Sequence, residues 1–371
     1  MSTEAPEEAD LPTLPIDEDF LRVKGRKMSV RGMLVGMKAL HASELFLKTG
    51  GTVRFKIDSR VVAFESDRIT SRAMDHILRC FLGDDERKRF AERQVADVVF
   101  ATENARFRVH FAYGHTGVYA AIRAIGDEIH PFNALGLPAP TQRKLVETEA
   151  GLVVVCGGTD AGKTVTCTAL LDFINRTREK ALLTLEDPIE YIFEDRRSFV
   201  IQREVGAHTP TFASGVKAAL RENLDVIFVG EMRDLDTIEQ VLRAAEMGHL
   251  VVTSLHADDA LSAITRIVGS FPPNEQGRIR QSLAGVLAGV VFQRLLPSTS
   301  GGRSPCVETL WPTTAVRTII RGGDLGKLGT YLGSAGGGLG YRECLRQLAS
   351  AGVISKETAE HEEARLRVIG N

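Results

Sequence analysis

The residues with the clearest chemical use form one run, Gly157-Gly158-Thr159-Asp160-Ala161-Gly162-Lys163-Thr164. It fits the P-loop pattern G-x-x-x-x-G-K-[ST], whose glycines let the backbone curl so that its N–H groups point at phosphate oxygens. Lys163 then supplies charge to the β- and γ-phosphates, and Thr164 supplies a hydroxyl to Mg²⁺. The alternative, a chance glycine turn, is disfavoured because an apolar strand precedes the run and an amphipathic helix follows it. The residues expected to bind nucleotide are Gly157, Gly158, Thr159, Asp160, Ala161, Gly162, Lys163, Thr164 and Val165.

An acid pair, Glu186 and Asp187, closes the apolar segment Leu182–Leu185. Carboxylates at the end of a buried strand are costly unless they face a cation or an active site. Glu186 is therefore a candidate to orient or deprotonate an attacking water. For Asp187, capping of a helix is the alternative.

A third strand-like segment, Val226–Val229, leads through a glycine to Glu231. Apolar residues followed by an acid form a Walker B-type element, so Glu231 is expected to hold the water shell of Mg²⁺ or to polarise the attacking water. Arg233 and Asp234 follow, and they could instead pair with each other and cap the next helix.

His256 closes a fourth apolar segment, Leu250–Thr253. A lone histidine is usually structural. Here it ends a strand beside others that end in phosphate or metal chemistry, so a γ-phosphate sensor is the favoured interpretation.

These groups must be positioned by a sheet. The four segments Leu152–Cys156, Leu182–Leu185, Val226–Val229 and Leu250–Thr253 are nearly continuous in apolar residues, which indicates strands buried on both faces of a parallel sheet in an α/β domain. Ligands of such sheets bind beyond the carboxyl ends of the strands, where all four candidate groups lie.

The rest of the chain divides by composition. Residues 1–27 are acidic and proline-containing, and we expect a flexible tail. Residues 28–130 alternate short strand and helix patterns, which predicts a small α+β domain. Residues 131–140 contain three prolines and are expected to form a hinge, and residues 141–371 form the α/β domain with a helical C-terminal region.

The bulk numbers narrow the classes of protein. A net charge of -2 argues neither for nor against nucleic acid, and a local basic groove stays open. Because no basic-aromatic surface is evident in the sequence, no nucleic-acid partner is expected. None of the five cysteines forms C-x-x-C, so no zinc ribbon is indicated, and scattered thiols fit a reducing cytoplasm. There is no basic-then-apolar leader and no run of about 18 apolar residues, so membrane contact is expected only through partners.

The four blocks, in this order, resemble the Walker A, Asp box, Walker B and His box of the secretion ATPases that drive type II secretion and type IV pili. The likeness is greatest to the pilus retraction ATPases. It extends to Gln202-Arg203-Glu204-Val205-Gly206, to Arg106-Phe107-Arg108-Val109 and to Ala315–Arg321, the last resembling a C-terminal helix associated with retraction. It covers about residues 28–365.

The resemblance implies a hexameric ring of RecA-like domains, each preceded by a PAS-like domain, with ATP and Mg²⁺ bound between the two domains and hydrolysed to ADP and phosphate. Arg108 and Arg123 would reach the phosphates and stabilise charge that develops in the transition state. Salt bridges on the sheet surface are the alternative for both arginines. The ring would work an inner-membrane platform protein and be cytoplasmic, held at the inner membrane through the pilus machine.

The chain departs from the family at Asp160-Ala161, where glycine-serine is usual. A carboxylate there should weaken nucleotide binding unless it points outward. Asp160 keeps open a second function, a weakly hydrolysing nucleotide-binding partner of another pilus motor. A type IVB or type II secretion ATPase also stays open, because the sequence separates it only weakly from a retraction ATPase. The absence of a tetracysteine element favours retraction over assembly.

Overall fold

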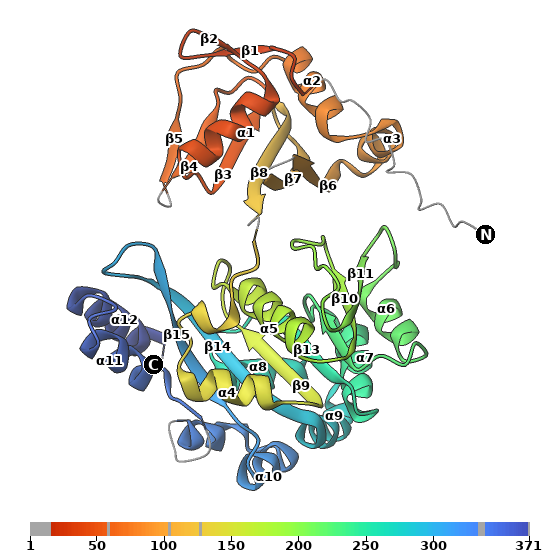
Figure 1. The fold of residues 1–371 in the computed structure, drawn as a ribbon, viewed down its shortest axis with the longest axis vertical. Helices are drawn as coiled ribbons and strands as arrows, with labels where there is room; N and C mark the ends of the chain where they lie inside the picture. The colour runs from red at the N-terminus through yellow and green to blue at the C-terminus, as the bar shows by residue number, and fades with distance from the viewer. Residues whose placement is uncertain (1–15, 58–59, 103–104, 126–127, 333–337, 370–371) are drawn as a thin grey trace. The chain divides into compact units, whose positions relative to one another are not determined.

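The computed structural model describes residues 16–57, 60–102, 105–125, 128–332 and 338–369 (Figure 1). The chain forms two compact units that divide between Asp127 and Glu128. The predicted hinge at 131–140 stays a prediction. Within it, Phe132 and Leu137 are buried in the core of the second unit.

The first unit is an antiparallel sheet with helices. Its sheet has the order β5-β4-β3-β8-β7-β6, and a separate hairpin pairs β1 with β2. The strands are β1 (Leu21–Val23), β2 (Arg26–Met28), β3 (Glu44–Lys48), β4 (Arg54–Ile57), β5 (Arg60–Ala63), β6 (Val95–Thr102), β7 (Ala105–Gly114) and β8 (Gly117–Ile125), and the helices are α1 (Val30–Ala39), α2 (Ser71–Phe81) and α3 (Asp84–Arg93).

The hairpin corrects one prediction. The acidic tail was expected to run to residue 27, and residues 1–15 lie outside the described residues. From residue 16 the prediction is wrong, because Ile16, Leu21 and Val23 are buried in the core of the first unit. Leu21 and Val23 alternate with an exposed residue, so one face of β1 can be buried. The acids Asp17, Glu18 and Asp19, between Ile16 and Leu21, concealed that short pattern.

The second unit is a seven-stranded sheet with helices on both sides. Its strand order is β11-β10-β12-β13-β9-β14-β15, parallel except for the antiparallel pair β14–β15. The strands are β9 (Gly151–Cys156), β10 (Ala181–Glu186), β11 (Phe199–Glu204), β12 (Val226–Val229), β13 (Leu250–Leu255), β14 (Leu287–Pro297) and β15 (Arg303–Leu310). The helices are η1 (Phe132–Ala134), α4 (Ala139–Glu147), α5 (Lys163–Thr177), α6 (Phe212–Ala219), α7 (Leu235–Glu246), α8 (Ala260–Gly269), α9 (Pro273–Val286), α10 (Thr314–Gly322), η2 (Leu325–Tyr331), α11 (Tyr341–Ser350) and α12 (Lys356–Ile369).

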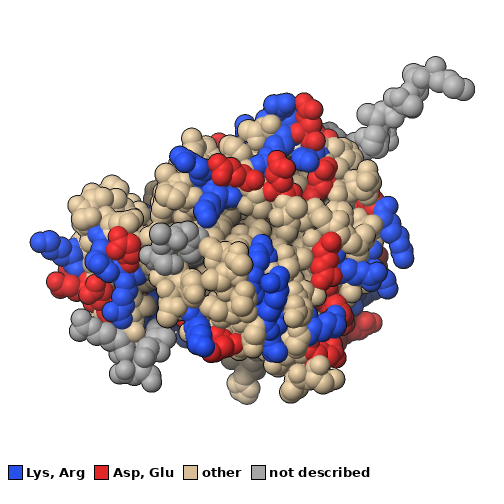
Figure 2. Space-filling view, turned by 90° about the horizontal axis from the view of Figure 1, so that it is seen from below, with Lys and Arg blue, Asp and Glu red and all other residues tan. Residues whose placement is uncertain are grey.

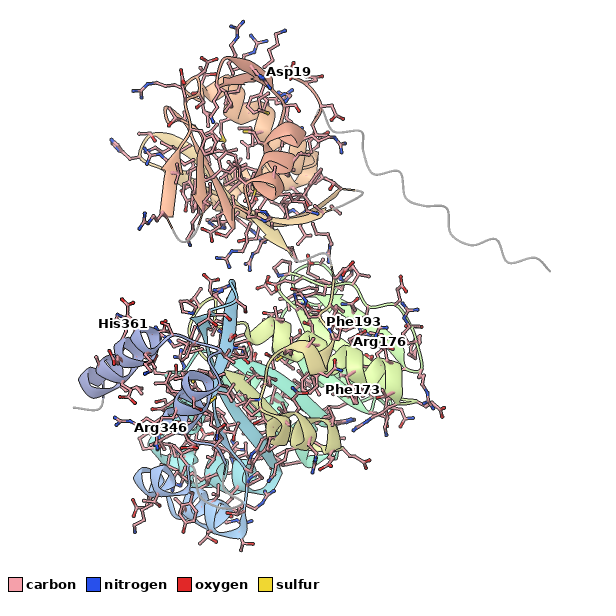
Figure 3. The ribbon with its side chains drawn as sticks, turned by 60° about the vertical axis from the view of Figure 1, so that its left-hand side comes forward. Asp19, Phe173, Arg176, Phe193, Arg346 and His361 are labelled. Atoms are coloured by element: carbon pink, nitrogen blue, oxygen red, sulfur yellow. The ribbon has the colours of Figure 1, made fainter. Side chains whose placement is uncertain are left out.

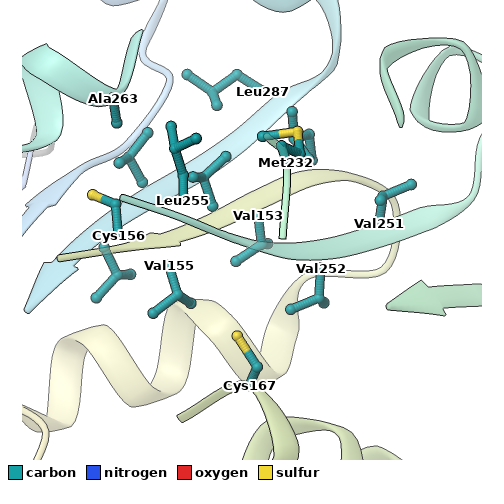
Figure 4. Close-up of a cluster of buried hydrophobic side chains, with 14 of the residues drawn as sticks. Val153, Val155, Cys156, Cys167, Met232, Val251, Val252, Leu255, Ala263 and Leu287 are labelled. Carbon is teal, nitrogen blue, oxygen red and sulfur yellow. The ribbon is translucent and has the colours of Figure 1, made fainter. Parts of the chain in front are cut away.

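The central strands carry the core. Every residue of β9, β12 and β13 is buried. Figure 4 shows Cys167 of α5 and Ala263 of α8 on opposite sides of these strands. The predicted α/β fold with a parallel-core sheet is confirmed. The prediction succeeded because strands that are buried on both faces consist of continuous apolar residues, which the sequence shows. The outer strands β11, β14 and β15 were not predicted.

Outside the core, the face of the molecule in Figure 2 carries lysines and arginines interspersed with aspartates and glutamates. Among the described residues, no helix combines the length and the apolar character that crossing a membrane requires.

Candidate active site at the ends of the parallel strands

The P-loop follows β9 and turns tightly into α5. Gly157 has φ 155° and Gly162 has φ 81°, both outside the range that residues with side chains prefer. A Cβ on Gly157 would lie 2.4 Å from the carbonyl oxygen of Gln293, so the loop can pass β14 only without one. The first amides of α5 have no carbonyl one turn earlier in the helix, and they are available to an anion.

The side chain of Lys163 folds back onto the P-loop and binds its backbone. Its Nζ donates to the carbonyl oxygens of Gly157 at 3.0 Å and Gly158 at 2.8 Å. Burial lowers the pKa of Lys163, and the nearby carboxylate of Glu231 opposes that effect. An ammonium that is partly buried beside carbonyl oxygens is ready to move to a stronger acceptor such as a phosphate.

Thr164 and Glu231 are the predicted Mg²⁺ residues. Within the described residues the Thr164 hydroxyl has no hydrogen-bond partner, which leaves its oxygen available as a ligand. No cluster of three or more His, Cys, Asp and Glu residues suited to a metal occurs in the part of the chain that the structure describes. Mg²⁺ commonly takes one or two protein ligands together with substrate phosphates and water, so this sparse set fits a cation that arrives with a nucleotide.

Gln293 on β14 is a site residue that the sequence analysis missed. It is 1% exposed, and its Nε2 donates to the Ala161 carbonyl at 2.6 Å. Its Oε1 accepts from the Thr166 hydroxyl at 2.8 Å. The amide thus fastens the P-loop and the first turn of α5 to the neighbouring strand. Because strand β14 was not predicted from the sequence, there was no reason to place Gln293 beside the P-loop.

Asp160 has the left-handed conformation, with φ 60°. Aspartate tolerates this region better than most residues with a Cβ. Asp160 is exposed and lines a cavity of about 220 Å³ together with Arg294, Arg303 and Arg365. Three arginines therefore line a cavity with Asp160 beside the P-loop, and Arg303 lies 3.5 Å from the backbone carbonyl oxygen of Asp160.

Glu186 ends β10 and is 3% exposed. Its Oε1 accepts from the Thr184 hydroxyl at 2.7 Å and from the Gln202 amide at 3.2 Å. Burial raises the pKa of Glu186 to about 7, and these two hydrogen bonds moderate the rise. A carboxyl that titrates near neutral pH suits a general base.

Glu231 and His256 meet at the ends of β12 and β13. The Nε2 of His256 lies 3.4 Å from Oε1 of Glu231, and the Nε of Arg233 donates to Oε2 at 2.7 Å. Burial lowers the pKa of His256, and the charge of Lys163 adds to that effect. The imidazole is therefore biased towards its neutral form, in which one ring nitrogen can accept and the other donate.

Asp234 is structural. It is the N-cap of α7, and its carboxylate accepts from the backbone N–H of Thr237 at 2.8 Å and from the hydroxyl of Thr237 at 2.8 Å. Capping was one of the two interpretations for Asp234. The suggested pair between Arg233 and Asp234 is not the one observed, because Arg233 donates to Glu231.

Arg108 and Arg123 belong to the sheet of the first unit, where β7 and β8 place them opposite each other. Like charges in such positions repel. Arg123 donates to Glu44 from Nε at 3.1 Å, and Arg108 lies 3.5 Å from Asp97. Burial alone would raise the pKa of Glu44, but Arg123 and Lys56 hold it below its usual value. Contact of either arginine with phosphates stays a prediction.

Residues 29–324 match the family described as type II/IV secretion system protein. The type IV pilus retractation ATPase PilT of Pseudomonas aeruginosa is 34% identical over 90% of this chain and 97% of its own. A twitching motility protein of Neisseria gonorrhoeae is 36% identical over 78% of this chain and 79% of its own. The crystal structure of the pilus retraction motor PilT with bound ADP superposes with a TM-score of 0.79, at 37% identity, over 90% of this chain and 96% of that one.

Proposed function

The chain belongs to the type II/IV secretion system protein family, and we propose that it is an ATP-hydrolysing motor subunit that powers retraction of a type IV pilus. The observation that carries this proposal is the convergence of a P-loop, Glu186, Glu231 and His256 at the carboxyl ends of neighbouring parallel strands. The likeness to retraction motors along nine-tenths of the chain supports it.

The proposed roles follow from where each group is held. Lys163 exchanges its two carbonyl acceptors for the β- and γ-phosphates. Glu231, held by Arg233, keeps its remaining acceptor capacity for the water shell of Mg²⁺, which would neutralise charge on the phosphates and which Thr164 would ligate. His256, beside Glu231, senses the γ-phosphate.

Glu186 is the proposed general base. A base must be deprotonated to accept a proton from water, and its carboxyl titrates near pH 7. The deprotonated fraction of Glu186 therefore changes steeply around pH 7. Arg108 and Arg123 are proposed to stabilise transition-state charge once they release Asp97 and Glu44.

The oligomer, partner and location are proposals of the same kind. We propose a homohexamer that acts on an inner-membrane platform protein from the cytoplasmic side, with no nucleic acid involved. Rigid-body closure of the two units on ATP would convert hydrolysis into motion. The division of the chain into two compact units is compatible with such closure.

Steady-state ATPase activity of the purified protein tests the proposal. Wild type should turn over ATP, whereas Lys163→Ala and Glu186→Gln should reduce turnover by a factor of about 10² or more. Lys88→Ala is the matched control, since Lys88 is exposed on α3 and forms a surface ion pair with Asp85. Wild-type turnover no higher than that of Lys163→Ala would contradict the motor assignment.

A second candidate, a weakly hydrolysing partner of another pilus motor, is favoured by the acidic P-loop residue. Asp160→Asn removes the charge and keeps a residue that tolerates φ 60°. If the Asp160 carboxylate weakens nucleotide binding and slows turnover, this variant should bind ATP more tightly and hydrolyse it faster than wild type. Unchanged kinetics would count against the second candidate.

A further inference from the structure

The proposed base is held by a residue on the neighbouring strand. We propose that Gln202 is the positioning residue of the base: its side-chain amide fixes one oxygen of Glu186 and ties it to the segment Asp187–Phe193, so that the position of this segment sets the competence of the base. This inference rests on the proposed ATPase function.

The parallel pairing of β10 and β11 explains why Gln202 can do this. Thr184 lies opposite Gln202 in the register, and Glu186 lies opposite Glu204. Because side chains alternate along strands, Thr184 and Glu186 project from the same face, as do Gln202 and Glu204. Two donors therefore meet on Oε1 of Glu186, from Thr184 at 2.7 Å and from Gln202 at 3.2 Å.

The orientation of the amide is fixed by its other partners. Its Oε1 accepts from the Phe193 N–H at 2.9 Å, so Nε2 must face the opposite side. There Nε2 donates both to the Tyr191 carbonyl at 2.9 Å and to Glu186. With both protons used, a rotated amide would place an oxygen against the carboxylate and break all three hydrogen bonds.

The arrangement distinguishes the two carboxylate oxygens. Oε1 of Glu186 accepts the two side-chain donors, whereas Oε2 accepts only a long contact from the Glu190 N–H, at 3.4 Å, within the described residues. Oε2 is therefore the oxygen that remains able to accept a proton from water.

The segment that Gln202 holds is anchored at both ends. Glu204, also on β11, accepts from the Ile189 N–H at 3.1 Å. Beyond Phe193, the Glu194 carbonyl accepts from Asn175 of α5 at 2.8 Å. Figure 3 labels Phe193 of this segment and Arg176 of that helix. Because α5 begins at the P-loop, this segment connects the phosphate-binding helix to the base.

The pH dependence of turnover reports this role. The Gln202 hydrogen bond favours the charged carboxylate, so its loss raises the pKa of Glu186. We expect Gln202→Met, which keeps the length and removes both donors, to move the acid limb of the kcat/KM profile upward by about one pH unit. Thr184→Val removes the other donor and should move the limb in the same direction. ATP affinity at pH values above the limb should stay unchanged, because the side-chain hydrogen bonds of Gln202 among the described residues go to Glu186, Tyr191 and Phe193 and not to the P-loop.

Gln347→Met is the matched control. Gln347 also donates to a glutamate, Glu343, at 3.0 Å, but on the exposed surface of α11. An acid limb that stays at its wild-type position in both Gln202→Met and Thr184→Val overturns the positioning role, even if kcat falls. A wild type without turnover, or a fully active Glu186→Gln, instead overturns the proposed function or the assignment of the base, and the positioning role with it.

Discussion

Replacing Gln293 with leucine should loosen the P-loop. The change leaves two buried polar groups without partners, the Ala161 carbonyl and the Thr166 hydroxyl. An unsatisfied buried group costs about 1–3 kcal/mol, so two such groups should lower the free energy of unfolding of the second unit by about 2–6 kcal/mol. The freed loop must also be ordered again when nucleotide binds, so ATP affinity should fall by about tenfold.

Chemical denaturation and nucleotide titration measure the two effects. Gln276→Leu is the matched control, because Gln276 is a partly buried glutamine whose amide donates to a single carbonyl, that of Phe271. It should cost about 1 kcal/mol and leave ATP affinity unchanged.

A double variant sharpens the reasoning. Thr166→Val removes the hydroxyl that Gln293 accepts from, so Thr166→Val with Gln293→Leu should cost less than the sum of the single changes, by about 1 kcal/mol. Strictly additive costs, or ATP affinity unaffected by Gln293→Leu, would refute the role of Gln293 as a fastening between loop and strand.

Three further predictions concern the strand ends. ATPase activity of the wild type should fall as the pH drops below about 7, because Glu186 becomes protonated there; a flat pH–rate profile between pH 6 and pH 8, measured at saturating ATP, would contradict this. Glu231→Gln should keep nucleotide binding and reduce turnover by a factor of about 10², as steady-state kinetics and an ATP-binding titration can show together. Asp234→Ala should lower the free energy of unfolding by about 1 kcal/mol through loss of the α7 cap and leave kcat within about twofold; a large loss of kcat would show that Asp234 does more than cap.

The interior of the sheet and the P-loop could be predicted from the sequence, whereas the edges could not. Strands such as β9 and β13 are buried on both faces, so their whole sequence is apolar. In contrast, β11 reads Phe-Val-Ile-Gln-Arg-Glu and is only partly buried, because it lies at the edge and uses polar residues to support its neighbour. Hydrophobic pattern alone does not identify such a strand.

The same distinction applies to the site. The candidate residues at the strand ends could be identified from their motifs, because each follows an apolar strand at a characteristic position. These residues are Lys163, Glu186 and Glu231. Gln202 and Gln293 act through strand pairing across the sheet, in registers that no local spacing encodes. Arg108 and Arg123 are a third case. The structure shows their ion pairs with Asp97 and Glu44, and their role toward phosphate stays a prediction.

The position of β9 also bears on how the chain is made. Its two neighbours in the sheet are β13 and β14, which begin at Leu250 and Leu287. During synthesis the P-loop leaves the ribosome long before β13 or β14 does. The contacts of Gln293 with the loop can form only after β14 has been made. A nascent chain that has not reached Pro297 therefore presents an apolar strand with one or both edges unpaired, a form prone to aggregation. ATP should bind more weakly during the early stages of folding, because Gln293 fastens the P-loop only after the last parallel strand has been made. Pausing or truncation before that point should leave a chain that depends on chaperones.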